Sequence, residues 1–297
     1  MALSRCGVQT NGQGRELVRH GTPAFPAACY HDDLAKDPVP WHWHTELEAF
    51  VVEEGTAVAA AGGERFPLRQ GEGFFVNSEV LHAVLDSGAP GCRLRSVVFH
   101  PRLVGGSPDS AFWLNYLNPL MGENGPGYVP FCGTEGWCGQ AVQAVQDAWT
   151  ACAEEPSGYE FLARTALSRL IFLLVQHRIP RASPKPAGIL RAEGRVKRML
   201  EYIHSRYDTE LTTAAIAHSA MVSESECLRC FRTVIGLPPG QYVTQYRIQM
   251  AAELLDASDL SVSEVGARCG FQDASYFAKT FRAQKGCSPS QYRGRRR

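Results

Sequence analysis

The last third of the chain contains the same short pattern twice. Phe231-Arg232 is followed by Gly236, Pro239, Gln241 and Tyr242, and after 50 residues the pattern returns as Phe281-Arg282 followed by Gly286, Pro289, Gln291 and Tyr292. Helix and turn signals precede each copy, so the repeated unit is predicted to be a helix–turn–helix, which places one helix in the major groove of DNA. The duplication therefore predicts an all-α domain with two such units.

The first unit has a clear helix start and a clear core face. Ser223 is a suitable N-cap, and Glu226 three residues later predicts a capping box. Apolar residues then recur at the spacing of one helix face, which predicts that this face is buried. These residues are Cys227, Cys230, Phe231 and Val234.

The second unit repeats this design with Gly270-Phe271-Gln272 as the turn and Asp273 as the N-cap. Its predicted inward residues are Tyr276, Phe277, Thr280 and Phe281. Between the units, residues 239–257 read as one amphipathic helix, which would fix the angle between the two readers.

These residues resemble the AraC/XylS family of bacterial regulators over residues 190–294. The stretch from Val265-Gly266 through Gly270-Phe271, Ser275-Tyr276-Phe277 and Phe281-Arg282 to Ser288-Pro289 and Tyr292-Arg293 is similar to the family signature. The resemblance implies DNA contacts from the outer faces of the two second helices. The residues on these faces are Ser225, Leu228, Arg229 and Arg232, and Ala274, Ser275, Ala278, Lys279 and Arg282. For each of them the alternative is a solvated helix face; Arg229 is the strongest candidate, because Arg bound to guanine is the commonest specific contact.

Charge is divided between the two parts of the chain. Residues 190–297 hold 16 Lys and Arg against 11 Asp and Glu, whereas residues 1–189 hold 14 against 19. The formal net charge of zero therefore combines a basic part and an acidic part, and a basic domain favours phosphate contacts.

Length and composition exclude other classes. A chain of 297 residues is long enough for two domains. It shows no apolar run of about 18 residues and no signal-peptide pattern, so we expect a cytoplasmic protein with no membrane partner. The ten cysteines are then expected to be mostly reduced, and none is assigned a function.

Residues 20–105 read as short strands separated by glycines. The expected strands are 48–53, 57–61, 73–76, 82–85 and 94–99, a pattern typical of a sandwich or barrel. Within them, His42, His44 and Glu48 precede Gly55, and Gly71 precedes His82. Strand alternation places the first three on one face, pointing inward, with His82 joining from across the barrel. Trp41 and Trp43 should point to the opposite face.

This constellation looks like the two motifs of the cupin family, a small β-barrel, over residues 35–100. The second motif departs from the pattern, with Asn77 and Glu79 where proline and glycine are usual. As part of an AraC-type regulator, the resemblance implies an effector domain without metal, in which His42, His44, Glu48 and His82 line the pocket of a small polar molecule such as a sugar. The alternative is an Fe, Mn or Zn site formed by these four residues, in a metal-dependent enzyme or a metal sensor.

Residues 111–178 change to helical periodicity. Three helices are expected, at 111–121, 139–153 and 159–178. The last two resemble the dimerisation element of AraC-type regulators, and the alternative is that they only close the barrel. A proline-rich stretch follows and reads as a linker.

The sequence thus predicts a multidomain β + α protein. Its parts are a cupin-like β-barrel (1–110), a helical dimerisation or closing segment (111–179), a linker (180–189) and a tandem helix–turn–helix domain (190–297). We expect a non-enzymatic, effector-responsive regulator that binds double-stranded DNA as a homodimer, and that contacts RNA polymerase if it is an activator. Effector identity, operator sequence and the sign of regulation stay open.

Overall fold

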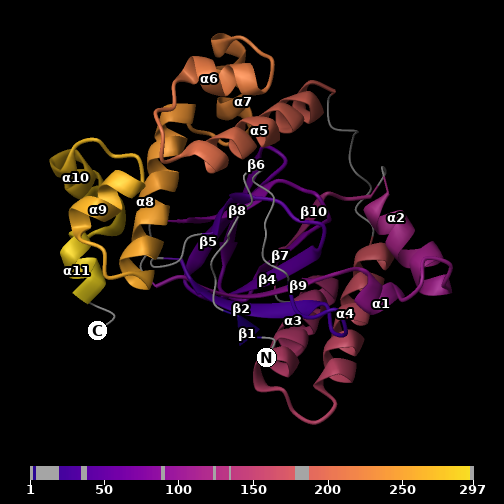
Figure 1. The fold of residues 1–297 in the computed structure, drawn as a ribbon. Helices are drawn as coiled ribbons and strands as arrows, with labels where there is room; N and C mark the ends of the chain where they lie inside the picture. The colour runs from indigo at the N-terminus through magenta and orange to yellow at the C-terminus, as the bar shows by residue number, and fades with distance from the viewer. Residues whose placement is uncertain are drawn as a thin grey trace. The chain divides into compact units, whose positions relative to one another are not determined.

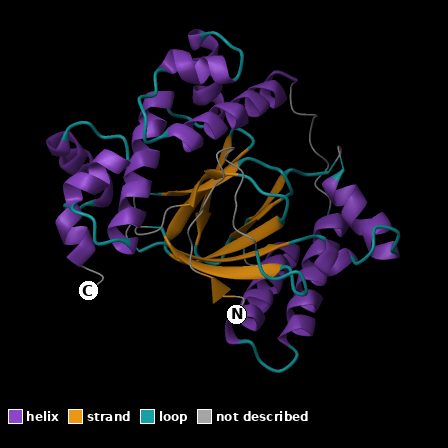
Figure 2. Cartoon of the chain, in the orientation of Figure 1, coloured by secondary structure: helices purple, strands orange, loops and turns teal. Residues whose placement is uncertain are grey.

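The computed structural model describes residues 3–4, 20–34, 39–87, 91–122, 125–133, 135–177 and 187–294. They form two compact units, one of strands and helices that reaches Ala187 and one of helices that begins at Gly188. Figures 1 and 2 show the two kinds of architecture. The predicted β + α fold class is confirmed. Most of the predicted linker, residues 180–186, lies outside the described residues. Helix α5 (Ala187–Arg206) begins three residues before residue 190, where the helical domain was predicted to start.

Two β-sheets build the first unit, and neighbouring strands in them are antiparallel apart from the pair β1–β2. The six-stranded sheet contains, in spatial order, β1 (Leu3–Ser4), β2 (Ala27–Asp33), β9 (Arg93–Phe99), β4 (Leu47–Glu54), β7 (Gly73–Val76) and β10 (Tyr128–Phe131). The four-stranded sheet contains β3 (Val39–His42), β8 (His82–Asp86), β5 (Thr56–Ala61) and β6 (Glu64–Arg69). The five predicted strands all exist, each within a residue of its expected bounds.

Strand β4 separates the two cores of this unit. Phe50 and Val52 belong to the apolar cluster shared with the four-stranded sheet. Ala49 and Val51 belong to the cluster shared with helices α3 (Gly136–Glu154) and α4 (Tyr159–Gln176). Because side chains alternate along a strand, Glu48 shares the face of Phe50 and points between the sheets.

Helices cover the other side of the six-stranded sheet. Before them come α1 (Arg102–Gly105), a π-helical turn η1 (Trp113–Leu117) and α2 (Asn118–Met121). Helices α3 and α4 run along each other beneath the sheet (Figure 1), and buried alanines of α3 let its backbone approach closely. Trp149 ties α3 to the sheet by donating its indole N–H to the Tyr30 carbonyl at 2.7 Å. On the outer face of α4, Phe161, Leu162 and Phe172 are exposed.

The second unit contains the two predicted helix–turn–helix pairs. The first is α6 (Thr213–Ser219) with α7 (Glu224–Val234), and the second is α9 (Val262–Arg268) with α10 (Ala274–Lys285). They are joined by α8 (Pro239–Ala257), whose bounds are those predicted, and α11 (Pro289–Gly294) follows. The predicted inward residues of α7 are all buried, as are Phe277 and Phe281 of α10.

A small residue lets the two helices of each pair touch. A Cβ added to Gly266 would lie 2.8 Å from the ring of Phe277, so only glycine fits there without a shift. Ala217 is buried in the corresponding helix of the first pair.

Both turns contain one residue with a left-handed backbone conformation, but the residue differs between them. Gly270 has φ +77° in the second turn, whereas Met221 has φ +55° in the first. A side chain is disfavoured in this left-handed region, so the first turn is strained where the second is not.

Two local predictions were wrong. Tyr276 is 55% exposed rather than inward, because Phe277 and Phe281 form the buried face of α10 and Tyr276 lies about 100° around the helix from Phe277. The Ser223 hydroxyl caps α7 by accepting a hydrogen bond from the Glu226 N–H. The Glu226 carboxylate, however, pairs with Arg229 and Arg195 and does not complete the predicted capping box. A complete capping box occurs at Ser261 instead.

Candidate functional site

The four predicted barrel residues meet in the interior of the first unit. His42 ends β3 and His82 begins β8, and the two are direct partners across this antiparallel pair. Glu48 enters from β4 in the opposite sheet, and His44 lies in the connection between β3 and β4. All four side chains are buried, and one potential ligand atom from each lies within 4.8 Å of the others.

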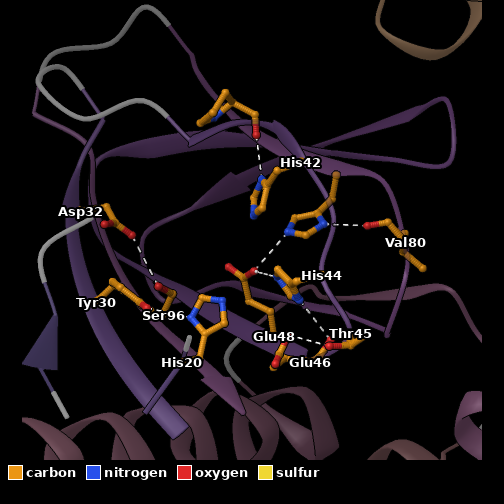
Figure 3. A network of polar contacts seen from close by, with 12 residues as sticks. His20, Tyr30, Asp32, His42, His44, Thr45, Glu46, Glu48, Val80 and Ser96 are labelled. Atoms are coloured by element: carbon orange, nitrogen blue, oxygen red, sulfur yellow. Dashed lines mark hydrogen bonds and ion pairs between the residues drawn. The ribbon is translucent and has the colours of Figure 1, made fainter. Parts of the chain in front are cut away.

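Glu48 is the centre of this cluster. Its Oε2 lies 3.0 Å from His44 Nε2 and 3.1 Å from His82 Nε2. Burial by itself would raise the pKa of the Glu48 carboxyl, but hydrogen bonds and charge interactions with His44 and His82 hold that pKa well below its usual value. Figure 3 shows Glu48 and His44 pointing toward one another inside the unit.

Each histidine of the cluster is anchored through its other ring nitrogen. Nδ1 of His42 is 2.8 Å from the carbonyl oxygen of Pro40, and Nδ1 of His82 is 2.8 Å from that of Val80. Nδ1 of His44 is 3.1 Å from the carbonyl oxygen of Glu46. A carbonyl oxygen can only accept a hydrogen bond, so each Nδ1 carries the hydrogen.

Further polar residues share the same interior space, and the sequence did not identify them. His20 Nδ1 is 2.7 Å from the Tyr30 hydroxyl, and the His20 ring centroid is 5.5 Å from that of His44. Ser96 donates to the Asp32 carboxylate at 3.4 Å. Figure 3 places these residues across the interior from His42. Ser96 could have been found from the alternation of its predicted strand, whereas Asp32 lies on a strand that was not predicted.

The departures from the second cupin motif have structural roles. The Asn77 amide donates to the carbonyls of Leu120 and Pro126 at 2.8 Å each, which fastens the α2 region to the end of β7. Glu79 has φ +60°, a conformation that glycine adopts without strain. Trp41 and Trp43 are both buried.

The residues predicted to contact DNA lie on the surface of the second unit. Seven of the nine are exposed and Leu228 and Ala278 are half-buried; the exposed ones are Ser225, Arg229, Arg232, Ala274, Ser275, Lys279 and Arg282. The structure leaves their side chains accessible on the outer faces of α7 and α10. Tyr276, which sequence reasoning placed in the core, is a further exposed residue in the first turn of α10.

Arg229 is held by a neighbour on its own helix. Its Nε donates to Glu226 Oε2 at 2.8 Å and its Nη2 donates to Glu226 Oε1 at 2.6 Å. Arg195 of α5 pairs with the same carboxylate. Hydrogen bonds from Arg229 lower the pKa of the Glu226 carboxyl to about 2, so Glu226 is ionised at neutral pH.

Membrane insertion finds no support in the described helices. Not one of them combines the length and the apolar character that crossing a bilayer requires.

Family comparisons match both units of the chain. Residues 25–171 match the AraC-like ligand binding domain, and residues 216–295 match a helix-turn-helix domain. The HTH-type transcriptional regulator YdeC of Bacillus subtilis is 27% identical over 282 residues, which cover 94% of this chain and 95% of YdeC. The HTH-type transcriptional activator RhaS of Escherichia coli is 25% identical over 280 residues, which cover 93% of this chain and 96% of RhaS.

Solved structures give similar matches. ToxT of Vibrio cholerae aligns with 90% of this chain and 96% of its own, at 11% identity and a TM-score of 0.45. The DNA-binding domain of AdpA, solved in complex with a target DNA, aligns with 35% of this chain and 91% of its own, at 32% identity and a TM-score of 0.32.

Proposed function

This chain is a transcriptional regulator of the AraC family, with an AraC-like ligand-binding domain and a helix-turn-helix DNA-binding domain, and from this premise we propose how its residues divide the work. The second unit reads an operator in double-stranded DNA through α7 and α10, and the first unit binds a small-molecule effector between its sheets. The protein acts in the cytoplasm and turns over no substrate.

The observation that carries the DNA-reading assignment is the accessibility of Arg229 on a helix whose opposite face is buried. The Arg229 side chain is 57% exposed, while Cys230 and Phe231 beside it are fully buried. The equivalent outer face of α10 carries Lys279 and Arg282. These two faces belong to helix–turn–helix pairs that the single helix α8 joins, an arrangement that suits two half-elements in successive major grooves.

The effector assignment rests on buried polar groups between the sheets. His44, Glu48, Asp32 and Ser96 all lie in that interior, which an apolar core would not need. Buried donors and acceptors of this kind fit a small polar molecule such as a sugar. Effector binding would act on DNA affinity only if it favours one arrangement of the chain over another.

The exposed apolar residues of α4 suit contact with a second copy. Phe161 is 76% exposed, and Leu162 and Phe172 lie on the same helix. Exposed aromatic and aliphatic side chains on one helix are typical of an interaction face. We therefore propose a homodimer through α4, with RNA polymerase as a further partner if the protein activates.

The direct test is selection of bound duplexes from a random pool with the purified protein, followed by sequencing. We expect a motif with two half-elements about one helical turn apart. Arg229→Ala should then weaken binding to that motif by about 1–3 kcal/mol, or roughly 5–150-fold, with little loss on random DNA. Arg69→Ala removes the same charge from an exposed position on β6 and serves as the control. Equal losses on selected and random duplexes would show that Arg229 contacts only phosphate.

A further inference from the structure

We propose that Cys132 and Cys138 are a thiol pair that a low-molecular-weight disulfide, such as oxidised glutathione, converts into an intramolecular disulfide bond. Cys132 directly follows β10, and Cys138 lies in the first turn of α3. The bond would therefore fasten the start of α3 to the end of β10. It involves none of the residues between the two sheets and is independent of the effector and DNA assignments.

These two cysteines differ from the others in accessibility. The structure describes nine cysteines, all with free thiols, and seven of them are buried. Cys132 is exposed and Cys138 is half-buried, so within the described part of the chain they are the two that a dissolved reagent can reach. Reactive cysteines are accessible, whereas buried ones are normally inert. Oxidation of the described cysteines should therefore begin at this pair.

The loop between β10 and α3 brings the two thiols together. Phe131, the last residue of β10, contacts Trp137 of α3 with ring centroids 6.1 Å apart, and each of these rings directly precedes one of the two cysteines. The Cys138 thiol accepts a hydrogen bond from the Cys132 N–H. The nitrogen and the sulfur of Cys132 are joined through Cα and Cβ alone. Rotation about the Cα–Cβ bond of the exposed Cys132 can therefore bring the two sulfur atoms into contact.

A carboxylate beside the pair favours the protonated thiols. Glu72, in the turn between β6 and β7, is held by the Arg69 N–H at 2.9 Å and by the Gly133 N–H at 3.1 Å. Burial raises the pKa of both thiols, and the negative charge of Glu72 raises it further. Because a thiolate is the attacking species, the pair should react slowly at neutral pH and faster as the pH rises. Reduction would have to release an unfavourable thiolate, so the bond, once formed, should resist it.

The oxidation is two successive exchange steps. The exposed Cys132 loses its proton and attacks one sulfur of oxidised glutathione, so that a new S–S bond forms, the glutathione S–S bond breaks and one glutathione leaves with the proton. Cys138 then loses its proton and attacks the Cys132 sulfur, and the second glutathione leaves. The two cysteines together lose two electrons and two protons, and one oxidised glutathione becomes two reduced molecules.

The bond would restrain α3 where it contacts the end of α4. Trp137, next to Cys138, stacks on His177 with ring centroids 5.2 Å apart and an angle of 11° between the rings. His177 is the C-cap of α4. Closing a loop of about seven residues mainly restricts the unfolded chain, and it should raise the unfolding temperature of the first unit by roughly 5–9 °C.

The test uses the full chain, reduced with dithiothreitol, desalted and incubated in mixtures of reduced and oxidised glutathione. Remaining thiols are alkylated, and mass spectrometry of the peptides locates every disulfide. We expect the bond between Cys132 and Cys138 to form first, to disappear on return to dithiothreitol, and to raise the unfolding temperature measured by tryptophan fluorescence. A Cys6→Ser chain is treated in parallel, because Cys6 lies outside the described residues, and it should form the same bond.

Three variants separate the roles of the residues. In Cys138→Ser the reaction should stop at the mixed disulfide between Cys132 and glutathione, and in Cys132→Ser the uptake of glutathione should be slower. Glu72→Gln should speed oxidation at neutral pH and shift the profile of rate against pH to lower pH. Glu64→Gln, which removes the same charge from an exposed position on β6, should change neither. A purely structural role of Glu72 would leave the pH profile unmoved.

The mapping on the wild-type chain decides the proposal even where a variant does not fold, which circular dichroism shows. Complete alkylation of Cys132 and Cys138 after incubation with oxidised glutathione would overturn it. A bond from Cys132 to a second chain, or a bond that forms only in denaturant, would overturn it as well. An unchanged pH profile in Glu72→Gln would refute the part assigned to the carboxylate.

Discussion

Replacing Glu226 by Gln should strengthen operator binding, because Glu226 holds the side chain of Arg229 in the unbound protein. The carboxylate accepts two hydrogen bonds from the Arg229 guanidinium, at 2.6 and 2.8 Å, and pairs with Arg195 as well. A guanidinium that binds two acceptors of guanine uses the same donors. Arg229 must therefore release Glu226 before it can read a base.

The size of the gain follows from the exposure of the pair. The side chains of Arg229 and Glu226 are 57% and 24% exposed, and an ion pair in such surroundings contributes about 0.2–1 kcal/mol. Its removal should tighten binding by about 1.4–5-fold. Loss of a negative charge beside the phosphates adds a smaller, salt-dependent gain on every sequence. In the double variant with Arg229→Ala, the sequence-specific part of the gain should vanish.

The assay is fluorescence anisotropy with the selected duplex and a random duplex, each at two salt concentrations. Glu224→Gln is the matched control, because it removes the same charge from the same first turn of α7. The reasoning is refuted if Glu226→Gln weakens binding to the selected duplex, which would mean that Glu226 orients Arg229 for its base. Identical gains in DNA affinity for Glu224→Gln and Glu226→Gln would show that the gain comes only from the loss of a negative charge.

Three stability predictions concern the helical unit. Its unfolding can be followed separately because all five tryptophans precede residue 150. A loss of helix in circular dichroism without a change in tryptophan fluorescence therefore reports the unfolding of this unit. Met221→Gly should stabilise it by about 0.5–1 kcal/mol, since a left-handed side chain costs more than the flexibility of glycine; no gain would mean that the turn is not strained. Gly270→Ala should cost at least about 2 kcal/mol, because its Cβ would lie 2.7 Å from the Tyr207 carbonyl oxygen and 3.0 Å from the Arg247 guanidinium; a neutral result would show that this turn can move. The lowered pKa of Glu226, about 2 against an ordinary 4.5, means that its pairing stabilises the fold above pH 4.5 and is lost as the pH falls toward 2; acid unfolding should therefore be less steep in Glu226→Gln than in wild type.

The helical unit was predictable in detail because its signals are local. N-caps, turn residues and the repeated apolar spacing all lie within a few positions of the elements they define, and α8 was predicted residue for residue. The failures there are residues whose orientation depends on tertiary structure. Tyr276 lies beside the buried face that Phe277 and Phe281 form. The Glu226 carboxylate pairs with the guanidinium groups of Arg229 and Arg195 rather than with a backbone N–H.

The sheets of the first unit were predictable only where a strand shows an apolar run or alternation. Strand β2 carries polar residues on its inner face, including Asp32, and β6 is largely exposed, so neither has a strand-like sequence pattern. The site residues themselves were found from spacing: His42, His44, Glu48 and His82 do converge. The hydrogen bonds from the three imidazoles to backbone carbonyls could not be predicted, since they depend on the rotation of each histidine ring, which the pattern of residues does not reveal.

The strand that carries Glu48 also carries the residues on which the helices pack, and this gives the site a mechanical consequence. Successive residues of β4 point to opposite faces, so Glu48 faces the histidines while Ala49 and Val51 face the cluster shared with α3 and α4. A ligand that shifts the backbone of β4 would move both faces of the strand together, because β4 is paired with β7 on one side and β9 on the other. Such a shift would displace the alanine face of α3, which packs on β4, and then α4, which packs on α3. The outer face of α4 is the proposed contact with the partner. A well-packed core transmits such shifts rather than absorbing them. The alternation of side chains along β4 therefore buries Glu48 and also links its position to the helices that pack on the other face of the strand.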